Sequence, residues 1–166
     1  AAAIRARQGS TFATTERNTN SLFGIYQLRV DEHALQANLR RDDSSQYGGK
    51  TTGAFTYGYR FAPSLRVTAG YATGFKAPSF NDLYYPGFSN PELEAERGRS
   101  VELGLEAELG AVRLVLSGFD NEFRELIQFD FATFAPENIG RARARGIEAS
   151  AELRHGALDL NAGATW

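Results

Sequence analysis

The stretch RSVELGLEAEL, residues 99–109, decides the fold class of this chain. Successive side chains of a β-strand point to opposite faces, so apolar residues at every second position form one apolar face. The apolar residues here are Val101, Leu103, Leu105, Ala107 and Leu109. Glu or Gly stands between them at positions 102, 104, 106 and 108. Helical spacing fits poorly, and the pattern predicts a strand with one apolar and one polar face.

The same alternation recurs along the whole sequence. It predicts eight strands, near residues 19–30, 34–42, 50–61, 65–75, 99–109, 111–129, 138–153 and 157–166. Tight connections alternate with longer ones, which fall at 43–49, 76–98 and 130–137. Outer-membrane barrels show this alternation because their periplasmic turns are short and their extracellular loops long. The sequence therefore predicts an all-β, antiparallel, up-and-down transmembrane β-barrel.

One strand has an ambiguous pattern. In residues 111–129, Val112 and Leu114 indicate one apolar face, whereas Val115 and Phe119 indicate the other. A β-bulge, which shifts the alternation by one residue, would reconcile the two.

Composition excludes several classes of protein. The net charge of −2 gives no excess of positive charge that would indicate nucleic-acid binding. The absence of Cys excludes a disulfide scaffold. No apolar run reaches the roughly 18 residues of a transmembrane helix. The two His residues stand apart, and no nucleophile, phosphate-loop or metal motif occurs. We therefore expect no catalytic residues, no cofactor and no metal site, so the protein is not predicted to be an enzyme.

Three motifs resemble those of TonB-dependent outer-membrane receptors. They are GYATGFKAPSFNDLY at 70–84, NPELEAERGRSVELGLE at 90–106 and ENIGRARARGIEASAEL at 137–153. Upstream, RNTNSLFGIYQLRV at 17–30 and DDSSQYG at 42–48 are similar to the cobalamin (vitamin B12) receptors of that family in particular. The motif residues, which we expect to have structural roles, are Lys76, Ala77, Pro78, Leu83, Tyr84, Asn138, Gly140, Gly146 and Glu148.

The resemblance implies a 22-stranded barrel in the outer membrane of a Gram-negative cell, with an N-terminal plug inside it. Residues 1–166 are then expected to be one barrel segment of about eight strands, without the plug. The implied function is TonB-dependent uptake of cobalamin or a similar metal chelate, with TonB contacted through the plug. A siderophore or haem receptor of the same fold is an alternative. A small complete eight-stranded barrel with an adhesive or structural role and a soluble β-sandwich are further alternatives.

Ligand contacts are expected in the longer connections. The exposed-aromatic candidates for holding a large, partly apolar ligand are Tyr84, Tyr85, Phe88, Phe131 and Phe134. The competing interpretation is that these rings pack the loops upon themselves or form part of an aromatic girdle.

A second candidate surface lies on the strand at 138–153. Arg141, Arg143 and Arg145 share the alternation of Ile147 and Leu153, which are expected to face lipid. The three arginines would then lie at the lipid boundary, where guanidinium groups suit the phosphates of lipopolysaccharide. A solvated run of charges above the membrane is the alternative.

Overall fold

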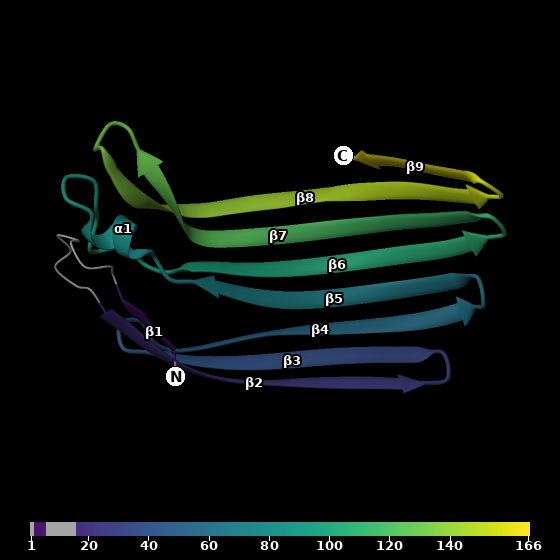
Figure 1. Ribbon diagram of the computed structural model, residues 1–166, viewed down its shortest axis with the longest axis horizontal. Coiled ribbons are helices and arrows are strands. Elements are labelled where there is room, and N and C mark those ends of the chain that lie inside the picture. The colour runs from purple at the N-terminus through teal and green to yellow at the C-terminus, as the bar shows by residue number, and fades with distance from the viewer. Residues whose placement is uncertain (1, 6–15) are drawn as a thin grey trace.

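The computed structural model describes residues 2–5 and 16–166, which form one antiparallel sheet of nine strands (Figure 1). The strands follow one another in chain order across the sheet. They are β1 (Ala2–Arg5), β2 (Glu16–Val30), β3 (His33–Ser44), β4 (Gly48–Ala62), β5 (Leu65–Lys76), β6 (Glu96–Leu109), β7 (Val112–Asp130), β8 (Ala135–His155) and β9 (Leu158–Thr165). A short helix, α1 (Phe80–Tyr84), lies between β5 and β6. The meander confirms the predicted fold class and all eight predicted strands.

The two ends of the sheet differ in their connections. At one end residues 31–32, 63–64, 110–111 and 156–157 join neighbouring strands in tight turns. Asp31, Gly110 and Gly156 have φ values of 50°, 64° and 61°, the left-handed conformation that short hairpin turns require. The other end carries the connections at 45–47, 77–95 and 131–134. The first of these is shorter than predicted because β3 and β4 continue their pairing to Ser44 and Gly48.

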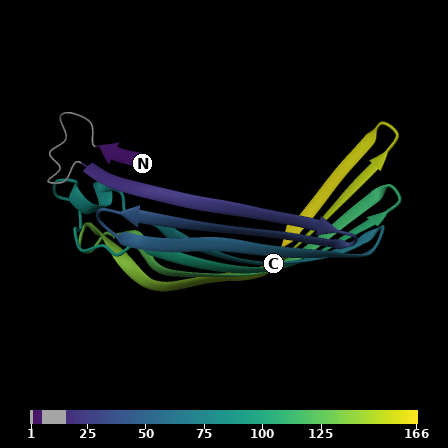
Figure 2. The ribbon, with the colours of Figure 1, turned by 90° about the horizontal axis from the view of Figure 1, so that it is seen from below.

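The strand register collects the apolar residues on one face. Across β5 to β8, Val67 pairs with Leu105, Leu105 with Leu116, and Leu116 with Ala149. None of the described residues forms a second layer on this apolar face, and Leu103 is 61% exposed and Ile147 51%. Figure 2 shows the single, strongly curved layer. The apolar rows do not meet a second sheet, so the soluble β-sandwich alternative is wrong for the described residues.

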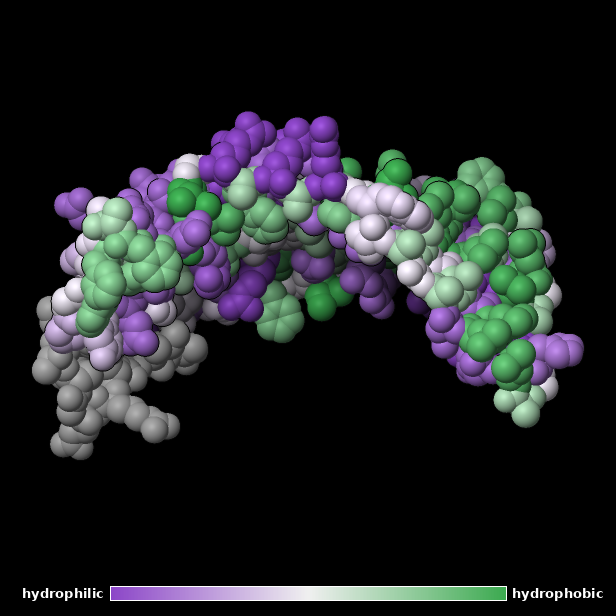
Figure 3. Space-filling view, turned by 90° about the horizontal axis from the view of Figure 1, so that it is seen from above, coloured by the Kyte–Doolittle hydropathy of each residue, from purple (hydrophilic) through white to green (hydrophobic). Residues whose placement is uncertain are grey.

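The apolar face changes character along the strands. Its rows near the tight turns are apolar, whereas its rows near the long connections carry Arg41, Arg99 and Arg143 among other charged residues. In Figure 3 hydrophobic residues gather on the arm toward the tight turns, and hydrophilic residues crowd the crest of the arch. We call the apolar rows, which on β6 run from Leu103 to Leu109, the apolar band. A band of this kind with short turns on one side is the arrangement of an outer-membrane barrel wall.

The predicted bulge in 111–129 is wrong. The pairing of β7 with β6 and with β8 keeps one register throughout, so Val112, Leu114 and Leu116 lie on the apolar face and Val115 and Phe119 on the opposite face. The irregularity in β7 is instead a left-handed φ of 55° at Glu125. A register shift does occur elsewhere, between Arg60 and Ala62 of β4.

The opposite face is mostly polar. Glu106 of β6 accepts a hydrogen bond of 2.7 Å from Arg113 of β7, and Glu152 of β8 lies 3.9 Å from the same guanidinium. Gln27 and Gln36 form a second cross-strand pair at 2.8 Å. We refer to this face as the lumen face. In the described part of the chain, no helix is long and apolar enough to cross a membrane.

The sheet is open at both edges. β1 pairs only with β2, and β9 only with β8, so the first and last strands of the described residues do not meet. A complete eight-stranded barrel would need such a closing pair. The structure therefore does not support the small closed barrel considered as an alternative.

Candidate functional site

The connection between β5 and β6 builds a small folded unit at the long-connection end. Ser79 caps α1: its hydroxyl accepts a bond from the Asp82 amide, and the Asp82 carboxylate accepts one of 2.8 Å from the Ser79 amide. This reciprocal capping box stabilises a helix of only five residues. Leu83 of α1 is fully buried, and Leu93 and Ala95 are 4% and 5% exposed. Pro78, which precedes the helix, is fully buried as well.

Arg17 of β2 anchors this unit to the sheet. Its guanidinium donates 2.8 Å hydrogen bonds to the Gln46 side chain and to the Pro78 carbonyl. The same group lies 5.2 Å from the Tyr47 ring centroid and 5.1 Å from that of Phe80, within cation–π range. The side chain is only 8% exposed. Arg17 therefore connects β2, the β3–β4 turn and the β5–β6 connection, a role that the strand pattern alone did not reveal.

Asn138 of β8 anchors the other side of the connection. Its side-chain nitrogen donates to the carbonyls of Glu94 and Glu125 at 3.0 and 2.7 Å, and its oxygen accepts from the Glu94 amide at 2.8 Å. The left-handed residue Glu125 supplies one of these carbonyls. Asn90 adds a bond of 3.2 Å to the carbonyl of Pro136. These contacts fix the β5–β6 connection beside the β7–β8 hairpin.

Four of the five predicted ligand-binding aromatics come together between these two connections. Phe88 lies 5.9 Å from Tyr85 and 5.0 Å from Phe134, measured between ring centroids. Phe129 lies 5.4 Å from Phe134 and 5.3 Å from Phe131. We call these five residues the aromatic cluster. Phe131 is 84% exposed and Phe134 52%, so the rings contact one another and still present apolar surface.

Tyr84, the fifth predicted residue, lies apart from the aromatic cluster. Its ring is 6.2 Å from Phe80, and its hydroxyl accepts a 2.9 Å hydrogen bond from Gln46. Tyr84 therefore belongs with the contacts around Arg17. Adjacent tyrosines in the sequence point to different clusters because the helix ends between them, with Tyr85 as its C-cap.

The remaining motif residues have varied surroundings. Lys76 ends β5 and lies 3.1 Å from Glu96 on β6, and Ala77 and Pro78 leave the sheet, as expected where Pro removes a backbone donor. A side chain at Gly146 would meet the Trp166 carbonyl at 2.4 Å, whereas Gly140 has open space around its Cα. Glu148 pairs with Ser117 on the lumen face.

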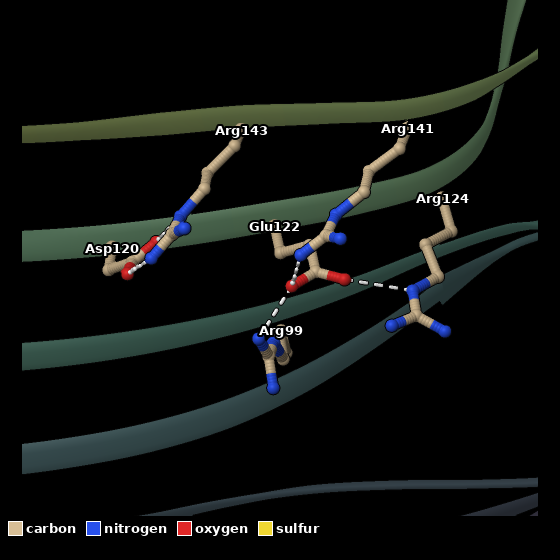
Figure 4. Close-up of polar contacts among 6 residues, drawn as sticks. All are labelled: Arg99, Asp120, Glu122, Arg124, Arg141 and Arg143. Carbon is tan, nitrogen blue, oxygen red and sulfur yellow. Dashed lines mark hydrogen bonds and ion pairs between the residues drawn. The ribbon is translucent and has the colours of Figure 1, made fainter.

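Arg141, Arg143 and Arg145 lie on the apolar face, in register with residues of β6 and β7. Glu122 of β7 joins three guanidinium groups (Figure 4): it accepts bonds from Arg99 at 2.5 Å and from Arg124 and Arg141 at 2.8 Å. Arg143 makes a two-point ion pair with Asp120. The hydrogen bond from Arg124, followed by those from Arg141 and Arg99, lowers the pKa of Glu122 from 4.5 to about 2. Sequence reasoning found the arginines of β8 but missed their partners on β6 and β7.

Carboxylates elsewhere do not gather into a metal site. Among the described residues, no group of three His, Asp or Glu side chains is arranged to hold a metal ion. The arrangement at this end of the sheet therefore offers two kinds of surface: exposed aromatic rings and a cluster of guanidinium groups.

Curated relatives are similar over nearly the whole chain. The vitamin B12 transporter BtuB of Vibrio vulnificus is 33% identical over 97% of this chain and 28% of its own length. The protein of the same name from Photobacterium profundum is 29% identical over 90% of the chain and 26% of its own length. The chain thus spans about a quarter of the length of these relatives.

Solved structures share the fold. The siderophore receptor PirA of Pseudomonas aeruginosa matches with a TM-score of 0.82 at 23% identity, over 92% of this chain and 32% of that one. A ferric enterobactin receptor, PfeA, of the same organism matches with a TM-score of 0.78 at 19% identity, over 98% of this chain and 29% of that one. The family model described as TonB dependent receptor-like, beta-barrel matches residues 2–166. The chain belongs to this family of outer-membrane transport receptors.

Proposed function

We propose that this chain is part of the barrel of a receptor that takes up cobalamin, or a similar metal chelate, across the outer membrane. The observation that carries the proposal is the 33% identity over 97% of the chain with a vitamin B12 transporter. We further propose that the receptor is powered through TonB, in line with the family name, and that TonB is contacted through a plug domain.

The aromatic cluster supports a role in holding cargo. It lies at the long-connection end, which faces the cell exterior in outer-membrane barrels. Contiguous large apolar side chains that are exposed to water often mark a binding surface, and Tyr85, Phe88, Phe131 and Phe134 are between 41% and 84% exposed. Rigid rings offer a large contact area at low entropic cost to a bulky, partly apolar ligand.

A siderophore receptor is the alternative. The solved structures similar to this chain include receptors for siderophores, but their identity of 23% or less supports the fold rather than the cargo. Exposed aromatic rings suit an aromatic iron chelate as well as a corrin ring. A binding experiment must therefore decide between the two cargoes.

The experiment uses the natural full-length polypeptide that contains this chain, purified in detergent. Calorimetry would measure the Kd for cyanocobalamin, ferric enterobactin and haemin. The variant Phe88→Ala/Phe134→Ala tests the aromatic cluster. The matched control is Phe61→Ala, because Phe61 is also exposed, at 62%, but lies at the tight-turn end.

We expect cyanocobalamin to bind more tightly than the other two ligands. Losing two ring contacts of about 0.5–1.5 kcal/mol each should weaken that binding by roughly 5- to 150-fold. Phe61→Ala should bind as the parent does. Tight binding of ferric enterobactin without cobalamin binding would replace the proposed cargo with the alternative. Cobalamin binding that is unchanged in the double variant would instead remove the aromatic cluster from the site.

A further inference from the structure

The outer end of the apolar face carries a regular grid of charged residues on β6, β7 and β8. The row farthest from the tight turns consists of Arg97, Arg124 and Arg141, each directly opposite its neighbour. The next two rows are Arg99–Glu122–Arg143 and Val101–Asp120–Arg145. We call these nine residues the arginine grid. It holds six arginines and two carboxylates, a net charge of +4.

The carboxylates do not neutralise the grid. Side chains directly opposite on neighbouring strands have Cβ atoms about 4.5–5.5 Å apart, where like charges destabilise the pairing. The row of Arg97, Arg124 and Arg141 places three such charges side by side without a carboxylate among them. Glu122 of the next row pairs with Arg124 and Arg141, but one carboxylate does not balance three guanidinium groups, so an external anion would stabilise the row further.

Glu122 holds the guanidinium groups together and leaves them accessible. Its side chain is only 2% exposed, whereas those of Arg99, Arg124 and Arg141 are 54%, 62% and 56% exposed. A guanidinium has five N–H donors, and each of these three gives one hydrogen bond to Glu122. The groups are therefore gathered around one buried carboxylate (Figure 4), with further donors directed elsewhere. Planar forks of this kind bind phosphate oxygens in pairs.

The position of the grid indicates which kind of molecule would supply the anion. The row that follows Val101, Asp120 and Arg145 toward the tight turns is Leu103, Gly118 and Ile147, the start of the apolar band. Figure 3 shows the hydrophilic crest directly beside hydrophobic surface. A lipid whose chains lie against Leu103 and Ile147 would carry its headgroup at the height of the grid. An acidic soluble protein would have no reason to bind next to a hydrocarbon boundary.

We propose that the arginine grid binds the phosphate groups of lipopolysaccharide in the outer leaflet, with Glu122 as the residue that positions Arg99, Arg124 and Arg141. The site is separate from the aromatic cluster and does not depend on the cargo. It extends the surface expected from Arg141, Arg143 and Arg145 to two further strands.

The test uses the full-length polypeptide that contains this chain, in nanodiscs of neutral phospholipid. Native mass spectrometry would compare the binding of bisphosphorylated lipid A with that of lipid A stripped of both phosphates. The variant Arg97→Gln/Arg124→Gln/Arg141→Gln removes the outermost row. Arg40→Gln is the matched control, because Arg40 is similarly exposed (51%) and ion-paired, with Asp42, but lies on the lumen face.

The parent should bind bisphosphorylated lipid A, and the triple variant should bind it at least about tenfold more weakly. The corresponding triple Lys variant should keep part of the affinity, since charge remains but the two-point geometry is lost. Arg40→Gln should match the parent. Equal binding of both forms of lipid A by the parent would overturn the proposal. So would equal affinity in the parent and in a triple variant that keeps the heat-resistant migration of a folded barrel.

Discussion

Leucine side chains are exposed in the tight-turn half of the sheet but buried in the unit at residues 77–95. Leu103 in the apolar band is 61% exposed, whereas Leu83 in α1 is completely buried. Within residues 2–5 and 16–166 the band is a single layer without protein against its apolar face. The connection, by contrast, folds around Leu83, Leu93 and Pro78.

The difference follows from the solvent on each side. Hydrocarbon covers an apolar strand face as well as protein does, so the band needs no core of its own. The long-connection end lies in water, and there apolar side chains are stabilised by burial against one another. The exposed leucines of the apolar band therefore mark the membrane zone, whereas Leu83 and Leu93 of the connection are buried by protein outside that zone.

The largest effect should come from truncating the buried leucine. Leu83→Ala removes the centre of the unit at 77–95 and should cost roughly 2–5 kcal/mol of local stability. Hydrogen exchange of the amides in that connection, in the full-length polypeptide, would measure the loss. Leu103→Ala is the matched truncation in the band and should change exchange there far less. Equal losses at the two sites would mean that the band also packs on protein.

A somewhat smaller effect should come from placing a charge in the band. Ala162 and Asn161 are neighbours on β9, exposed on the apolar face and the lumen face respectively. Ala162→Arg should destabilise the barrel by roughly 2–4 kcal/mol, because a cation near the bilayer midplane lacks a polar partner. Asn161→Arg should be close to neutral. Unfolding by urea in lipid vesicles would compare them, and similar costs for the two variants would contradict the assignment of faces.

The smallest effect should be a dependence on pH at the arginine grid, which lies beyond the apolar band. The pKa of Glu122 is lowered to about 2 in the folded chain, so its carboxylate favours folding above its ordinary value of 4.5. That contribution should be lost as the pH falls from 4.5 toward 2. The protection factors of the β7 amides near Glu122, which correct for the slower intrinsic exchange in acid, should therefore fall on acidification. Glu122→Gln should abolish this fall, and a variant that still responds would show that another group titrates.

Much of the fold could be predicted from alternation alone. The period of two in 99–109 is a local property, and it assigned Leu103 and Leu105 to the correct face before any partner strand was known. In 112–130 both faces carry apolar residues, because Val115 and Phe119 point to the lumen side. The pattern there was ambiguous, and a bulge was wrongly predicted where the register is in fact continuous.

The candidate sites could be predicted only in part. The aromatic residues of the longer connections could be predicted as candidates, because the loops of outer-membrane barrels carry the residues that contact ligands. The way in which these rings group could not be predicted, since Tyr84 lies with the contacts around Arg17 whereas Tyr85 contacts Phe88. The pairing of Arg99 with Glu122 follows in principle from the tight turn at 110–111, which fixes the register of β6 and β7. That signal was available in the sequence and was missed.

The sequence by itself determined the strands, their faces and the family, because alternation, turn residues and motifs are read over a few neighbouring positions. Only the tertiary structure decided that Arg17 fastens the 77–95 unit, that Asn138 holds its other side and that three strands meet at Glu122. These contacts join residues distant in the chain, and their partners depend on the path of long connections, which local patterns leave free.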